Sequence, residues 1–214
     1  MRVYVESGVN LGGTDETVAW TFDLRHWGLC GQGSSEHEAV AALLEVTRET
    51  DAEVIERIDG DERAFDFDRR LPLLEERRLT LEILAAARPT TIDLVRGATD
   101  AQLDWVDPDR GLPEWATWQT ARQLAWHIVD CESRYYLPRT GCSYREPASN
   151  LIDELFESEQ HVRRTIMELP AETLAHETEA EVWTSVKLLR RLAWHERGEI
   201  VVLRELLKKT EQSH

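Results

Sequence analysis

Cysteine is scarce in this chain, and long apolar segments are missing. Three cysteines in 214 residues, Cys30, Cys131 and Cys142, are too few and too scattered for a disulfide framework, so we expect them to be reduced. No apolar run approaches the roughly 20 residues that a membrane-spanning helix needs. The opening residues, MRVYVESGVN, contain no apolar core typical of a signal peptide. These absences predict a cytoplasmic protein that does not enter a membrane.

Basic residues are also in short supply. Lys and Arg number 25 against 41 Asp and Glu, which gives a formal net charge of −16. A protein that binds nucleic acid needs a basic patch that releases counterions from phosphates, and no Lys or Arg cluster here offsets the overall field. We therefore expect no nucleic acid as a partner. Hydrophobic residues make up 42% of the chain, which is enough for the core of one large domain or two small ones.

Residues 1–66 carry the patterns of strands and one helix. Alternation of polar and apolar residues indicates half-buried strands, and Ser35 followed by Glu38 is typical of a capping box that begins a helix. The predicted elements, in chain order, are strands over 2–6, 18–24 and 27–32, a helix over 36–50 and a strand over 53–58. The order is β-β-β-α-β.

Residues 67–214 carry helical patterns, and no strand pattern intervenes. The predicted helices run from 71 to 96, from the 115–118 stretch to 137, over 151–169 and over 182–209. Pro89 is expected to break or kink the first helix, and Pro138 to end the second. The predicted fold is therefore α+β, with a small N-terminal domain (1–66) and an up-down four-helix bundle (67–214) whose core would hold any ligand.

Two histidines interrupt the apolar faces of these helices. In the last helix the inward seam is Leu188, Leu192, His195, Glu199, Val202 and Leu206, and in the second it is Thr117, Thr120, Leu124, His127, Cys131 and Arg134. A buried imidazole or carboxylate costs several kcal/mol unless it is paired or binds a metal. We therefore predict a metal site formed by His127, His195 and Glu199, with open coordination positions that suit catalysis.

Neighbouring polar residues have candidate roles at such a site. Asp130 or Glu196 could accept the free ring N–H of a ligand histidine, and Arg134 could receive an anionic group of a substrate. Cys131 fits either a buried inert cysteine or a soft ligand.

Both histidines could also be ordinary core residues. In that case His195 and Glu199 form a helix-surface pair, and Arg191 or Arg197 neutralises Glu199.

Residues 1–66 resemble the HicB-like antitoxin domain. The resemblance lies in the motifs WTFDL (20–24), GLCGQG (28–33) and SEHEAV (35–40). It implies a module that binds a partner or regulates without catalysis. The alternative is a stabilising appendage or a dimerisation element.

Residues 69–209 resemble the DinB-like superfamily of metal-binding four-helix proteins. The resemblance lies in the motifs WQTARQLAWHIVD (118–130), LLRRLAWHER (188–197) and ATDAQLD (98–104). It implies one ligand histidine from the second helix, matched by His127, and two ligands a turn apart on the last, usually His-x-x-x-His. His195 matches the first of these, and Glu199 stands where the second histidine is usual. A shifted alignment would make Glu196 the third ligand instead.

The DinB-like resemblance also implies a divalent-metal-dependent enzyme with a homodimeric structure. A carboxylate ligand favours Mn or Fe, with Zn and Ni as further candidates. The implied chemistry is that of a thiol-dependent transferase or isomerase, or of a hydrolase, in which the metal activates a low-molecular-weight thiol or water toward a small-molecule substrate. The alternative is a non-catalytic binding or regulatory protein with a degenerate metal site.

Overall fold

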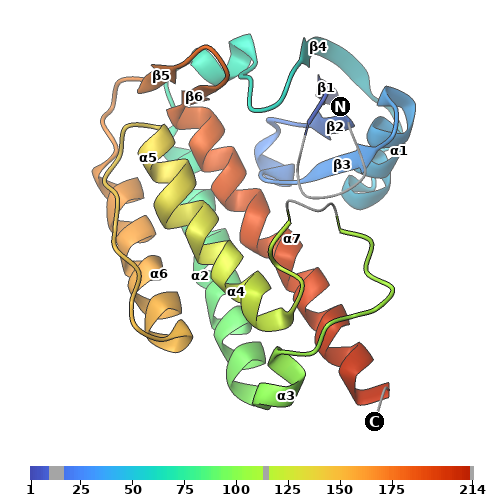
Figure 1. Ribbon diagram of the computed structural model, residues 1–214. Coiled ribbons are helices and arrows are strands. Elements are labelled where there is room, and N and C mark those ends of the chain that lie inside the picture. The colour runs from blue at the N-terminus through green and yellow to red at the C-terminus, as the bar shows by residue number, and fades with distance from the viewer. Residues whose placement is uncertain (10–16, 113–115, 213–214) are drawn as a thin grey trace.

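The protein combines an N-terminal sheet with a C-terminal set of helices (Figure 1). The computed structural model describes residues 1–9, 17–112 and 116–212. Strands β1 (Arg2–Ser7), β2 (Thr17–Trp20), β3 (Cys30–Gly33) and β4 (Glu53–Asp59) form a sheet in the order β3-β2-β1-β4. The β1–β4 pair is parallel and the other two pairs are antiparallel. Helix α1 (Glu36–Thr47) covers this sheet, so the predicted order β-β-β-α-β is confirmed.

Local hydrogen bonds explain where α1 begins. The Ser35 hydroxyl accepts a hydrogen bond from the Glu38 N–H at 3.3 Å, as the capping pattern predicts. The Glu38 carboxylate accepts from the Ser34 N–H instead of reaching Ser35. The prediction of a strand as far as residue 24 is wrong, because β2 ends at Trp20 and the 3-10 turn η1 (Leu24–His26) follows, capped by Asp23.

The C-terminal part is mainly helical. Its long helices are α2 (Leu74–Gly97), α4 (Ala121–Asp130), α6 (Leu151–Glu168) and α7 (Ser185–Gln212), with the short α3 (Asp100–Leu103) after α2. Helix α2 packs against both α7 and α6. This packing offsets the backbone hydrogen bond lost at Pro89, so α2 continues through it, and of the predicted break or kink only the break is overturned. Within the described ranges, no helix is both long and apolar enough to cross a bilayer.

The predicted second helix is built from three pieces. It begins at α4 because Thr120 accepts a hydrogen bond from the Gln123 N–H at 3.2 Å, a capping box that the expected start at 115–118 overlooked. The π-helical segment η3 (Cys131–Tyr136) and the short α5 (Leu137–Arg139) follow without interruption. Pro138 therefore does not end the helix, which includes it and ends one residue later at Arg139.

A two-stranded sheet precedes α7, which corrects the prediction that no strand lies among the helices. Strand β5 (Ala175–Glu177) pairs with β6 (Val182–Thr184) in antiparallel register. The residues of β6 are all buried, and the Val182 N–H donates to the backbone oxygen of Glu62 at 2.9 Å. This tertiary contact favours a strand where the sequence pattern extends the helix, so α7 begins at Ser185.

Buried ion pairs join the N-terminal segment to α7. Arg191 lies 3.3 Å from a carboxylate oxygen of Glu62 and 3.5 Å from one of Glu6. Lys187 also pairs with Glu62, at 2.8 Å. The other buried pair in this interface joins Asp68 to Arg190, at 2.9 Å. These charges fix one face of α7 against the N-terminal sheet and leave its other faces to the helices.

Gly28 is expected to be indispensable for this interface. It has a φ of +72°, and an added Cβ would lie 2.6–2.8 Å from atoms of Ala193 on α7. Gly28→Ala should lower the free energy of unfolding by about 3 kcal/mol, because left-handed strain and a backbone clash add. Urea denaturation measures this change. Gly97→Ala is the control, since an added Cβ meets nothing within 4 Å there, and equal stability of the two variants would contradict the expectation.

Candidate metal centre

His127, Cys131 and His195 converge at the contact between α4, η3 and α7. Each offers one ligand atom, and the three atoms lie within 4.8 Å of one another. The Cys131 sulfur is 3.5 Å from His127 Nδ1, and the two imidazole centroids are 5.3 Å apart. Within the part of the chain that the structure describes, this trio can hold a metal ion. The structure thus brings both predicted histidines together and adds a thiol.

The elements around the trio orient its rings. His127 lies in the last turn of α4, and Trp118 stacks on its imidazole at a centroid distance of 3.8 Å. Tyr136 packs edge-on against His195 at 5.4 Å. Cys131 opens the π-helical segment, a local irregularity that is common at functional sites. The helical backbone and these aromatic contacts hold the ligand atoms in place before any ion arrives.

Burial keeps both imidazoles neutral. It lowers the pKa of His127 to about 4, with a smaller contribution from the charge of Arg110. His195 is only 3% exposed, and burial holds its pKa well below the usual value. Its Nδ1 atom is buried and has no hydrogen-bond partner among the described residues. Neutral imidazoles present the free lone pairs that a metal ion requires.

Cys131, unlike the two imidazoles, must lose a proton before it can bind a metal ion. Burial raises the pKa of Cys131 well above its usual value, and nearby carboxylates add to the effect. Without a cation the side chain is therefore a protonated thiol. Binding of a divalent ion would release that proton, since thiolate is the ligand form of cysteine.

Glu199 borders the trio without joining it. Its Oε1 is 4.0 Å from His195 Nε2, one turn further along α7, but the carboxylate is not part of the compact group. Burial raises the pKa of Glu199 to about 7, and the charge of Arg110 opposes this shift. Glu199 therefore lies where it can meet a ligand or substrate bound beside His195.

Asp130 and Arg134 lie away from the trio. Arg134 pairs with Asp130 on its own helix and with Glu154 on α6, the latter at 2.9 Å. The π-helical segment explains this, because its wider turn shifts the phase after Cys131 and turns Arg134 toward α6. Neither residue is placed for its predicted role at the histidines.

Glu196 also faces elsewhere. Its carboxylate accepts hydrogen bonds at 2.7 Å from Arg88 Nε and from the Thr91 hydroxyl, both on α2. Consecutive residues of a helix point about 100° apart, so a residue adjacent to His195 is directed to another face. The same Arg88 binds Glu132, which follows Cys131 in the sequence.

Comparisons of this chain with protein-family models, with curated proteins and with solved structures found no match. Its function must therefore be inferred from the site itself.

Two residues beside the trio were not predicted from the sequence as part of the site. Arg110 donates a hydrogen bond to the Trp118 backbone oxygen at 2.7 Å, and its charge acts on both His127 and Glu199. It lies in the segment between α3 and α4, where no periodicity indicates the direction of a side chain. Trp118 belongs to the motif of the DinB-like resemblance, but its stacking on His127 depends on how the chain enters α4.

Proposed function

We propose that His127, Cys131 and His195 bind a divalent metal ion in an enzyme of the DinB-like type. In this proposal α2, α4 with η3, α6 and α7 form the four-helix bundle of that superfamily. The observation that carries the proposal is the convergence of three ligand atoms, from two separate helical segments, in a mostly buried place. Imidazole nitrogen and thiolate sulfur are the ligand types that zinc prefers in proteins.

The ligand chemistry favours zinc. A thiolate with two imidazoles is a softer set than the predicted two histidines and glutamate, and it suits Zn or Ni better than Mn or Fe. Three protein ligands leave a position open, which is typical of catalytic zinc sites. A metal bound here supplies Lewis acidity that deprotonates a thiol or water near neutral pH. Glu199, beside His195, is the candidate for an additional carboxylate contact.

The surrounding residues suit a small substrate. Arg110 takes the role predicted for Arg134, since its charge acts on both His127 and Glu199 and can attract an anionic group. Trp118 shields one face of His127 and limits the access of water to it. We propose that the reaction is a thiol-dependent transfer or isomerisation with a low-molecular-weight thiol as co-substrate.

The alternative is a non-catalytic binding or regulatory protein. The observation that favours it is the set of contacts that the trio makes with its neighbours, since the Cys131 sulfur lies 3.5 Å from His127 Nδ1 and Trp118 stacks on the same ring. Metal binding therefore separates the two functions.

Calorimetric titration of the metal-free protein tests the proposal. Zn, Ni, Mn and Fe(II) are added separately, and we expect one ion per chain with Zn bound most tightly. Cys131→Ser should weaken Zn binding by roughly 100-fold while changing Mn binding much less, because a hydroxyl is a harder ligand than a thiolate. Cys142→Ser is the matched control outside the trio. Absence of stoichiometric binding by every metal would contradict the proposal.

Addition of glutathione to the Co(II)-loaded protein then tests the thiol-dependent reaction. A thiol that coordinates the metal should add a sulfur-to-cobalt charge-transfer band. An unchanged spectrum at millimolar glutathione would contradict the thiol-dependent reaction. It would not contradict metal binding by the trio.

A further inference from the structure

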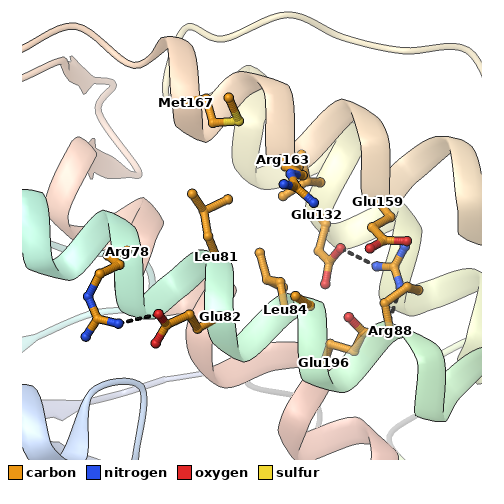
Figure 2. A pocket seen from close by; sticks show the side chains of 12 residues that line it. Arg78, Leu81, Glu82, Leu84, Arg88, Glu132, Glu159, Arg163, Met167 and Glu196 are labelled. Carbon is orange, nitrogen blue, oxygen red and sulfur yellow. Dashed lines mark hydrogen bonds and ion pairs between the residues drawn. The ribbon is translucent and has the colours of Figure 1, made fainter.

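A second site lies between α2 and α6, apart from the metal centre. The cavity there has a volume of about 250 Å³. Its walls are apolar and include Leu81 and Leu84 of α2 with Val162 and Met167 of α6 (Figure 2). Three charged side chains, Arg88, Glu132 and Glu196, form its floor. An apolar pocket with a few convergent polar groups is the usual form of a small-molecule site.

The floor carries two carboxylates and one guanidinium. Arg88 donates at 2.7 Å to Glu132 through Nη2 and at 2.7 Å to Glu196 through Nε. All three side chains are at most 2% exposed. The third Arg88 contact is to a neutral group, the Leu155 backbone oxygen at 2.6 Å. One guanidinium therefore faces two buried carboxyl groups.

Each carboxylate also keeps one unused oxygen. Glu132 Oε1 and Glu196 Oε2 are buried and accept no hydrogen bond from the described residues. Figure 2 shows both carboxylates beside Arg88, at the end of the cavity away from Met167. Buried oxygens of this kind cost free energy unless a donor reaches them. A donor that reaches both oxygens would satisfy them.

The rim does not supply that partner. Arg78 forms ion pairs with Glu75 and Glu82 on its own helix. Arg163 and Glu159 line the opposite side from α6. In the described part of the chain, no second cation forms an ion pair with Glu132 or Glu196.

We propose that this cavity binds a small organic ammonium ion, with its charged head between Glu132 and Glu196 and its apolar chain along Leu81 and Val162. An ammonium group can donate a hydrogen bond to each of the two free oxygens, and it adds a second cation beside two carboxyl groups that share one guanidinium. The volume is at the small end of ligand sites, so the chain is short. The site does not require the metal, although Glu132 follows Cys131 and Glu196 follows His195 in the sequence.

Isothermal titration with three probes of equal length tests this proposal: hexylammonium, 1-hexanol and hexanoate. We expect one hexylammonium per chain, bound roughly tenfold or more tightly than hexanol, because a charged hydrogen bond is stronger than a neutral one. Hexanoate should not bind. The order of affinities for the three probes should be the same in the metal-free and the Zn-loaded protein. No binding of hexylammonium, or equal affinity for hexanol, would overturn the proposal.

Two variants locate the site. Ala85 is exposed and lines the cavity, so Ala85→Phe should block hexylammonium binding without disturbing the core. Ala86→Phe is the matched control, since Ala86 is also exposed but is not part of the lining. Glu132→Gln should reduce the preference for hexylammonium over hexanol by roughly tenfold. Binding that survives Ala85→Phe, or an unchanged preference in Glu132→Gln, would place the ligand elsewhere.

Discussion

Replacing His195 with alanine is expected to lower zinc affinity by more than about 100-fold. Loss even of a residue that only orients a metal ligand typically costs 10–100-fold in affinity, and His195 is proposed to be a ligand itself. The effect should be as large for His127→Ala, because the two imidazoles come from separate elements and neither can substitute for the other. Competition with a chromophoric chelator measures both constants.

His161→Ala is the control for the histidine variants. His161 lies on α6 and contacts the Ser143 backbone oxygen at 3.0 Å, away from the trio. The His161→Ala substitution should leave the affinity for zinc unchanged. Equal affinity of wild type and His195→Ala would show that zinc binds at another place.

Replacing Arg88 with methionine is expected to lower the free energy of unfolding by about 3–5 kcal/mol. Arg88 is 1% exposed and is the cation that binds both Glu132 and Glu196. Its removal leaves two carboxylates buried side by side, and burial already raises the pKa of Glu132 to about 8. Urea denaturation at neutral pH measures the loss.

Two further variants separate charge from packing in that experiment. Arg78→Met removes an exposed arginine of the same helix and should cost less than about 1 kcal/mol. A triple variant with Met at 88 and Leu at 132 and 196 should recover much of the lost stability, because an apolar cluster replaces the buried charges. If Arg88→Met and Arg78→Met were equally stable, the buried network would not stabilise the fold as described.

The N-terminal elements could be predicted because their signals are local. Alternation gave the approximate positions of the strands, and the Ser35–Glu38 pair correctly marked the start of α1. Strand β6 was missed because its formation depends on tertiary contacts, among them the hydrogen bond from Val182 to Glu62. Pro89 does not break α2 for the same reason, since packing on two sides keeps the helix continuous there.

The site could be predicted only as far as regular α-helical phase extends. His127 and His195 lie within α4 and α7, so the expectation that they converge is met by the geometry. Cys131 lies one regular turn after His127, on the seam that the sequence predicts, whereas the π-helical segment changes the phase after Cys131 and turns Arg134 toward α6. No residue pattern marks such a segment in advance.

Zinc X-ray absorption of the loaded protein identifies the atoms that bind the ion. We expect a first shell of one sulfur at about 2.3 Å and two imidazole nitrogens at about 2.0–2.1 Å, with an oxygen or nitrogen atom in the remaining position. The sulfur should disappear in Cys131→Ser, and the Cys142→Ser control should retain it. A shell without sulfur and with no imidazole scattering would contradict a metal centre formed by His127, Cys131 and His195.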